Sequence, residues 1–303
     1  MNKLLLSYIL TIGLSAAAGV GTGIVLKKTV GPIDEMYPPG FDPAEFSPNT
    51  EEIMKKYNSR SDRSYNGVKD FEDYELINVV SEKFKQCENC YSISIGEAKT
   101  IVTQTIRNAQ IKNGNEYFED QLSYSSMVAL AKRSYQHGKD GEIDVYDGTA
   151  TDSEVASYGA KTASYNKKDY KDLLGKSLDE MFIYIISEKT VLDSSRSVKG
   201  NDVIVKLNLD PNLSTFYYKT QMLNLSGLSN LPPFSEVKLT YTFSKNLALT
   251  HISVDETFVA TKAGIPVPAT TNNVIEIYYY ADQYYQIPDV NTLIPFSKIV
   301  EEA

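Results

Sequence analysis

The sequence predicts an α+β fold in which an N-terminal transmembrane helix precedes a curved antiparallel sheet, a half-barrel, wrapped around helices. Three observations lead to this fold class. An uncharged run opens the chain, short segments of alternating hydrophobicity separated by Gly or Asp turns fill much of its length, and a few helical patterns interrupt those segments. Strands joined by short turns pair antiparallel, whereas parallel pairing needs a crossover helix after nearly every strand.

The run from Leu4 to Leu26 has no charged side chain and is flanked by Lys3 and by Lys27–Lys28. A helix of about 20 apolar residues spans a bilayer, so residues 1–28 are predicted to be a transmembrane signal anchor. The alternative is a secretory signal peptide cleaved after Ala18, where small residues cluster. We expect a single-pass protein of the cell membrane with the bulk of the chain extracytoplasmic; the weak charge bias leaves a cytoplasmic domain as the other orientation.

The composition of the chain indicates which classes of partner it can bind. The chain has 39 acidic against 30 basic residues, a net charge of −9, and 42% of its 303 residues are hydrophobic. Binding to nucleic acid rests on neutralising phosphates with Lys and Arg, so no nucleic acid is expected as a partner. The 22 tyrosines and the absence of tryptophan fit strand and surface packing, with a tyrosine-lined binding face as the alternative.

Residues 29–66 are predicted to form an extended spacer, because five prolines stand among Gly, Asp and Glu between Thr29 and Thr50 and proline-rich linkers are semi-rigid and extended. An extracytoplasmic α+β domain then occupies residues 67–303. It opens with an amphipathic helix from Val68 to Phe84, where apolar residues recur every three to four positions.

A second helix is predicted from Ser94 to Ala109, because Ser94 and Glu97 have capping-box spacing. Its many β-branched residues make a strand the alternative. Beyond Gly114 the period changes to that of a strand meander. The expected strands are Tyr117–Tyr124, Met127–Gln136, Glu142–Tyr146 and Glu154–Tyr165.

The second half alternates between helices and strands. A capping box at Ser177 begins a helix that runs to Ile186, and Asp210 followed by proline begins another. Between them, Glu188–Val198 and Asp202–Leu209 are predicted to pair through a Gly turn. Three strands close the sheet: Val237–Phe243, Leu247–Thr261 and Val274–Tyr280. A sheet of about eight antiparallel strands tends to curl.

The order of these elements over Ser94–Ala281 resembles the lipoprotein-carrier group, the LolA and LppX type of incomplete β-barrel. The resemblance implies a concave face that holds acyl chains or lipids. The chain departs from that group in its transmembrane segment, its proline spacer and an extra helix.

These observations favour a non-enzymatic protein that binds a hydrophobic or lipid-like ligand in its curved sheet. The alternative is an interaction or scaffold module of the cell envelope with a filled core. Glu256 interrupts the apolar face of its strand, where a carboxylate needs a partner. It is predicted to bind a polar group of the ligand; the alternatives are that a bulge turns it outward or that it pairs with Lys or Arg. The other predicted ligand-binding residues are inward-facing: Phe182, Ile186, Leu207, Phe216, Tyr241, Ile252 and Phe258.

Cys87 and Cys90 form the only CxxC pair, and a local structural disulfide is the main interpretation. A thiol-disulfide oxidoreductase is the less favoured alternative, because the pair follows a helix and has Glu88 beside it. The CxxC pair supplies only two zinc ligands and no second pair occurs, and two histidines, His137 and His251, are too few for a zinc triad without carboxylates. No nucleophile elbow, phosphate loop or HExxH motif occurs. We therefore expect no catalytic residue, no metal and no cofactor.

Overall fold

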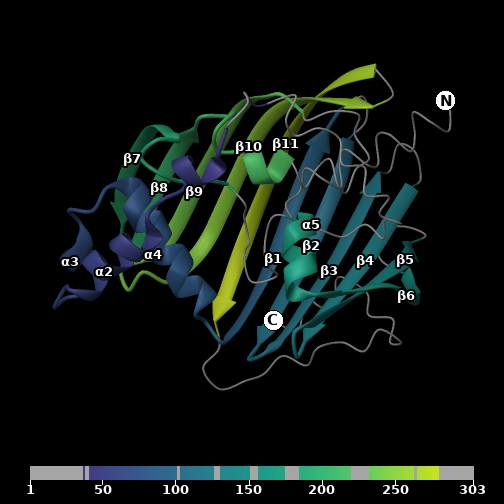
Figure 1. Cartoon of the computed structure of the whole chain (residues 1–303), viewed down its shortest axis with the longest axis horizontal. Helices are drawn as coiled ribbons and strands as arrows, with labels where there is room; N and C mark the ends of the chain where they lie inside the picture. Colours follow the sequence, from purple (N-terminus) through teal and green to yellow (C-terminus); the bar gives the residue numbers. More distant parts are fainter. Residues whose placement is uncertain are drawn as a thin grey trace.

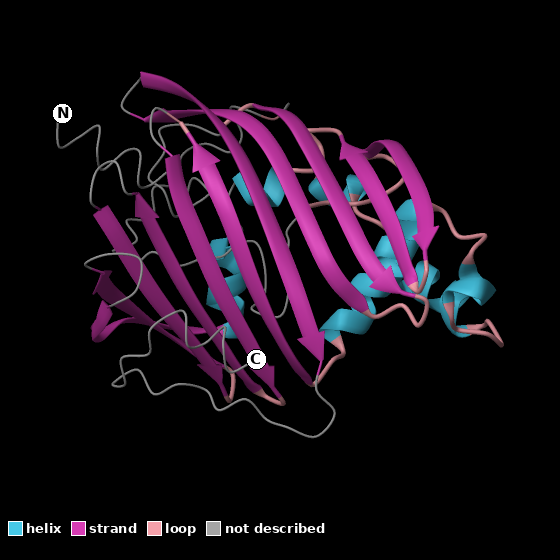
Figure 2. Cartoon of the chain, turned by 180° about the vertical axis from the view of Figure 1, so that it is seen from behind, coloured by secondary structure: helices cyan, strands magenta, loops and turns pink. Residues whose placement is uncertain are grey.

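The computed structural model describes residue 37 and residues 41–100, 103–125, 130–150, 156–174, 184–219, 232–262 and 265–279. Within these ranges one antiparallel sheet of eleven strands dominates the molecule, and short helices lie on one of its faces (Figure 1 and Figure 2). We call the face that carries helices α2, α4 and α5 the helical face, and the opposite face the outer face.

Four short elements precede the sheet: η2 (Pro43–Phe46), α2 (Thr50–Asn58), α3 (Tyr65–Val68) and α4 (Asp73–Lys85). Helix α4 begins with a capping box in which Glu75 accepts a hydrogen bond from the backbone of Glu72. The same Glu75 carboxylate binds Lys56 of α2 at 2.7 Å. Helix α2 and the start of α3 lie within residues 29–66, the predicted spacer, and α2 contributes Ile53 and Tyr57 to the core.

The strands form two meanders. The first comprises β1 (Asn89–Lys99), β2 (Thr103–Asn113), β3 (Glu116–Ser125), β4 (Leu130–Lys139), β5 (Glu142–Ala150) and β6 (Ala156–Asn166), and helix α5 (Lys167–Leu174) follows it. The second comprises β7 (Val191–Lys199), β8 (Asp202–Leu209), β9 (Phe234–Ser244), β10 (Leu249–Lys262) and β11 (Ile265–Tyr279).

Across the sheet the order is β6-β5-β4-β3-β2-β1-β11-β10-β9-β8-β7. The first and last strands of the chain therefore pair at its centre, from Cys90 opposite Tyr279 to Lys99 opposite Thr270. Strands β6 and β7, which are neighbours in sequence, are the two outer edges. Figure 1 shows α5 lying over the first meander on the same face as α4.

Tight turns set the register of the hairpins. Asp140 and Gly141, between β4 and β5, both have positive φ, 51° and 90°, as a two-residue type I′ turn requires. Gly200 has φ 63° between β7 and β8, and this is the Gly turn that the sequence predicts.

The apolar core lies between α4 and strands β8–β11. Alternation on β8 places Val203, Val205, Leu207 and Leu209 on the helical face, each at most 2% exposed. Helix α4 covers them with side chains that include Leu76, Val79 and Val80. Because α2 packs behind α4, this half of the helical face is filled by the protein's own side chains.

The predicted fold class is wrong. The described chain is one broad antiparallel sheet with short helices on one face, rather than a half-barrel wrapped around helices. No helix within the described ranges is long and apolar enough to cross a membrane. The predicted signal anchor, Leu4–Leu26, lies outside those ranges, so the correction to the fold class concerns the described part of the chain alone.

The helix predicted from Ser94 to Ala109 is also wrong, because β1 and β2 occupy that segment and pair with each other. The strand alternative was correct: β-branched side chains fit a pleated surface better than a helix. The helix predicted over Val68–Phe84 corresponds to α3 and α4, and the remaining predicted strands correspond to β3–β11. The helix predicted from Ser177 lies mostly outside the described residues.

Candidate functional site

The structure places most of the predicted ligand-binding residues in the filled core. Leu207, Tyr241, Ile252 and Phe258 are at most 3% exposed, and Ile186 is 8% exposed. All five belong to the same cluster as the side chains of α4. Phe216 lies outside this cluster, with its ring 4.9 Å from that of Tyr37, and Phe182 lies outside the described residues.

This packing overturns the prediction of a lipid-binding protein, and the resemblance to the lipoprotein-carrier group stays a prediction. Five of the apolar side chains predicted to line a lipid cavity belong instead to the same core cluster as side chains of α4, so they stabilise the fold. The predicted alternative, an interaction module with a filled core, agrees with the packing of this half of the sheet. Its partner stays a prediction.

Glu256 lies on the helical face of β10 and is 2% exposed. Its carboxylate accepts hydrogen bonds from three hydroxyl groups. Thr271 Oγ1 of β11 donates at 2.7 Å, Tyr218 Oη donates at 3.4 Å, and Tyr184 Oη donates in a shorter contact. The buried carboxylate thus has hydroxyl partners rather than the Lys or Arg partner considered from the sequence, and the pattern needs no outward bulge.

Burial dominates the electrostatics of this group. Desolvation raises the pKa of Glu256 to about 7, although the hydrogen bonds from Tyr184, Thr271 and Tyr218 oppose the rise. The same burial, together with the nearby carboxylate, raises the pKa of Tyr184 and Tyr218 well above 10.0. The cluster can therefore exchange one proton near neutral pH, at Glu256.

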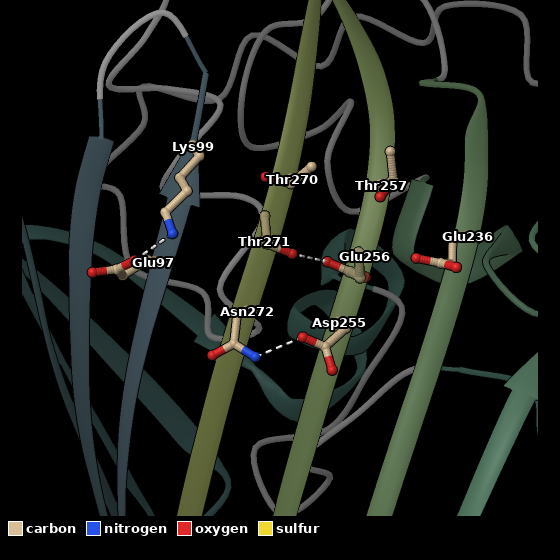
Figure 3. Close-up of a pocket in the computed structure, with 9 residues that line it drawn as sticks. All are labelled: Glu97, Lys99, Glu236, Asp255, Glu256, Thr257, Thr270, Thr271 and Asn272. Atoms are coloured by element: carbon tan, nitrogen blue, oxygen red, sulfur yellow. Dashed lines mark hydrogen bonds and ion pairs between the residues drawn. The ribbon is translucent and has the colours of Figure 1, made fainter.

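A cavity of about 240 Å³ adjoins Glu256 between β1, β9, β10 and β11 (Figure 3). Its polar lining is paired internally: Asn272 donates to Asp255 at 2.6 Å, and Lys99 lies 3.0 Å from Glu97. Within the described ranges no group of three or more His, Cys, Asp or Glu is placed to hold a metal ion. These contacts leave the acidic lining engaged with its neighbours.

A second polar region covers the helical face where the two meanders meet. Three carboxamide side chains there, which we call the amide cluster, are Asn108 on β2, Gln121 on β3 and Asn273 on β11. They are 5%, 1% and 3% exposed. Among the described residues, neither the oxygen nor the nitrogen of the Gln121 and Asn273 amides has a hydrogen-bond partner, and Asn108 Oδ1 has none.

The register brings the amide cluster together. Asn108 stands opposite Gln121, and Asn108 Nδ2 donates to Glu119 Oε1 at 2.8 Å. Asn273 stands opposite Gly96 of β1. Between β11 and β2, strand β1 turns only small side chains to the helical face. This small-residue row comprises Ser92, Ser94, Gly96 and Ala98.

Gly96 is needed for this arrangement. A Cβ atom at this position would lie 2.9 Å from both Asn273 Oδ1 and Asn272 O, closer than real Cβ contacts allow. The Asn273 amide therefore lies over the backbone of Gly96 and points across the small-residue row.

Cys87 and Cys90 are free thiols in the structure. They lie at one end of β1, beside a cavity of about 450 Å³ formed by the α4–β1 junction, the β2–β3 and β4–β5 turns and the start of α5. Cys87 is half-buried and lines the cavity, whereas Cys90 is 4% exposed. The predicted disulfide stays a prediction.

Sequence reasoning identified Glu256 and the cysteines but missed the amide cluster. Asn108 fell within the helix wrongly predicted over Ser94–Ala109, so its face was not assigned. A strand assignment of that segment would have shown the signal, because Ser92, Ser94 and Gly96 alternate with the larger Tyr91, Ile93 and Ile95.

Comparison with known proteins assigns the chain to no family. No family model and no curated protein matches the chain. Two solved structures are similar to part of it. The N-terminal β-barrel domain of Pseudomonas aeruginosa OprF is 4% identical, with 63% of this chain and 98% of that one covered at a TM-score of 0.20. Rv2717c from M. tuberculosis is 9% identical, with 65% and 96% covered at a TM-score of 0.22. Such low scores carry no functional argument, so the function is argued from the residues of this chain.

Proposed function

We propose that this β-sheet protein binds, without catalysis at that site, a small, uncharged, polar molecule against the helical face of β1–β3 and β11. The carrying observation is the amide cluster, in which both Gln121 and Asn273 are buried with whole carboxamides unpaired. A buried polar group without a hydrogen bond costs about 1–3 kcal/mol. A bound molecule that pairs with these amides would offset that cost.

The chemistry of the cluster favours a neutral ligand. Each carboxamide offers donors and an acceptor, and the neighbouring Ser92 and Ser94 add hydroxyl groups. The carboxylate beside the cluster, Glu119, already accepts from Asn108. Vicinal hydroxyls present donors and acceptors in the same alternating manner, so a saccharide or another polyol is the class of ligand that fits best.

The shape of the strand supports the same proposal. Gly96 and Ala98 leave β1 without bulk on the helical face, between the amides of β2 and β11. The neighbouring apolar half of this face is filled by α4. Support for ligand binding thus comes from the polar half of the helical face. The proposed ligand is therefore polar, whereas the sequence predicted a hydrophobic one.

A ligand screen tests this proposal. Unfolding temperatures would be measured with neutral mono- and disaccharides and linear polyols, and the hits confirmed by native mass spectrometry. A ligand at 100 times its Kd stabilises the folded protein by about 2.7 kcal/mol. We expect a concentration-dependent rise for wild type that is lost in Gln121→Met and Asn273→Leu.

The matched control is Gln86→Met, which changes the same residue type at an exposed position. This variant should keep the full response. A panel that produces no saturable rise, together with a high-resolution structure in which only water pairs with the amides, would overturn the proposal.

A further inference from the structure

The cavity that contains Cys87 suggests chemistry that the proposed ligand site does not use. It lies at the end of the sheet where β1 begins, and several elements converge on it. Gly114 N of the β2–β3 turn donates to Glu88 O at 2.8 Å, and Lys167 N of α5 donates to Gly141 O at 3.2 Å. Fixed backbone contacts therefore define the walls around the thiol.

The two thiols occupy different environments. Cys87 lines the cavity, where a solute can reach it, and Cys90 lies behind it within the core. Only two residues separate the thiols in the sequence, and the Cys87 thiol donates to Asn89 O at 3.2 Å. A dithiol exchange pair requires an accessible attacking sulfur and a more protected second sulfur near it in the chain.

Charges around the cavity are mixed. Four lysines and three glutamates line it, and Lys139 is paired with Glu116. Lys112 Nζ donates to Lys85 O at 2.6 Å, close to the thiols. The charged lining residues are Lys85, Glu88, Lys112, Glu116, Lys139, Glu142 and Lys167, and the lining phenols are Tyr117 and Tyr170.

The electrostatics agree with this geometry. The hydrogen bond from the Cys90 thiol lowers the pKa of Cys87 to about 6, helped by the backbone of Asn89 and by Lys112, while desolvation and Glu88 oppose the shift. The same contact and burial raise the pKa of Cys90. Tyr279, which faces the pair from β11, has its pKa raised chiefly by its own burial.

We propose that Cys87 and Cys90 form a thiol–disulfide exchange site whose substrate is a small-molecule or peptide disulfide bound in this cavity. The Cys87 thiolate attacks one sulfur of the substrate R–S–S–R, forming Cys87–S–S–R and releasing one R–S⁻. That thiolate takes the proton of the Cys90 thiol. Cys90 then attacks the Cys87 sulfur and expels the second R–S⁻.

The sum of the two steps balances. One substrate disulfide gains two electrons and becomes one thiol and one thiolate, which takes a proton from solvent, and the Cys87 thiolate and Cys90 thiol lose two electrons and become the Cys87–Cys90 disulfide. The disulfide predicted from the sequence is thus the oxidised state of this site. The free thiols of the structure are its reduced state.

Reaction with oxidised glutathione tests the proposal on the full chain. In Cys90→Ser, we expect a stable glutathione adduct on Cys87, identified by mass spectrometry. In wild type the adduct should resolve to an intramolecular disulfide, and excess reduced glutathione should return the free thiols. Cys87→Ser should form neither product.

Alkylation with iodoacetamide across pH 4–9 supplies a second measurement on wild type alone. We expect Cys87 to react first, with a midpoint near pH 6, so that roughly 30 times more thiolate is present at pH 7 than for an ordinary thiol of pKa about 8.5. Cys90→Ser keeps a donor and should hold the midpoint, whereas Cys90→Ala should raise it. An ordinary midpoint, first reaction at Cys90, or a disulfide that resists reduced glutathione would each overturn the proposal.

Discussion

At the scale of single residues, the structure shows why a charged side chain can stand on the core face of a strand. Glu256 interrupts the apolar row of β10, and three hydroxyl groups from other elements compensate its two oxygens. Because those groups donate from Tyr184, Tyr218 and Thr271, the site tolerates either protonation state. The pH of the solution then decides how much the cluster contributes to folding.

Glu256→Gln tests this contribution. The pKa of Glu256 rises from 4.5 to about 7 on folding, so its stabilisation is complete below pH 4.5 and is lost as the pH rises to 7. A shift of this size corresponds to about 3 kcal/mol. We expect the free energy of unfolding of Glu256→Gln, relative to wild type, to increase by that amount between pH 5 and pH 8 in urea titrations.

Glu188→Gln, at an exposed position, is the control for Glu256→Gln and should keep a constant difference from wild type. If the Glu256→Gln difference were also constant across this range, the carboxyl group would not change protonation on folding.

In the amide cluster, we expect an engineered apolar side chain to stabilise the protein. Gln121→Met keeps the length of the side chain and removes two unpaired polar atoms. In ligand-free protein we expect the free energy of unfolding to rise by about 1–3 kcal/mol. Chemical denaturation measures this change, and a loss of stability would mean that solvent already satisfies the amide in the wild type.

Some of these site residues could be identified from the sequence, and others could not. Glu256 could be identified because strict alternation fixes the face of each residue on a strand. The hydroxyls that bind it could not, since Tyr184 and Tyr218 come from segments distant in sequence. Asn273 and Gln121 read as ordinary polar residues until the pairing of β11 with β1 placed them on a covered face.

At the scale of elements, α4 is held to the edge of the sheet by one side chain of β7. Arg196 Nε binds Asp73 Oδ1 at 2.6 Å, and its guanidinium also donates to the carbonyl oxygens of Lys69 and Phe71 at 2.9 and 2.6 Å. The planar guanidinium carries donors on three nitrogen atoms and reaches three acceptors at once. The single ammonium nitrogen of a lysine cannot reach all three.

Arg196→Lys should therefore destabilise the protein by about 1–3 kcal/mol, the usual contribution of hydrogen bonds to charged groups. Urea denaturation measures the loss. Arg60→Lys is the matched control, because Arg60 binds the more exposed Asp70, and exposed ion pairs contribute about 0–1 kcal/mol. Equal effects of the two substitutions would contradict the role assigned to Arg196.

The element-level prediction failed where two patterns overlapped. Ser94 and Glu97 satisfy the spacing of a capping box, yet they lie on a strand. A capping box contributes about 1 kcal/mol or less at a helix end, whereas pairing on both sides of β1 satisfies the backbone of the whole segment. Long-range pairing decided the structure there, and no short sequence window contains it.

At the scale of the whole molecule, the β7–β11 half of the sheet contributes most of the main core cluster, whereas the β1–β6 half buries separate apolar side chains such as Phe118, Tyr135 and Ile143. The main core cluster draws on β8–β11, α2 and α4, with a few residues of β1 and β2, and the described residues of β3, β4 and β5 lie outside it. Cooperative opening follows the distribution of buried apolar contacts. The two halves should therefore differ in local stability.

Hydrogen exchange measured by mass spectrometry tests this difference. Peptides of β9 and β10 should exchange only at denaturant concentrations that unfold the whole protein, and peptides of β4 and β5 should exchange at lower concentrations. Saturating ligand should reduce the difference in protection between these two sets of peptides if the amide cluster binds it. Equal protection of both sets without ligand would show that the sheet opens as a single unit.

The strand order has one more consequence. Across the sheet the strands run β7 to β11 and then β1 to β6, so a circularly permuted chain that passed from β11 to β1 would list its strands in spatial order. The natural chain instead must close its central ladder between residues as distant as Cys90 and Tyr279. Such closure is slow, because folding rates fall as contacts become less local. We expect the ladder that unites the two meanders to form last, and a permutant begun at β7, in which fewer residues separate β11 from β1, to reach the same sheet sooner.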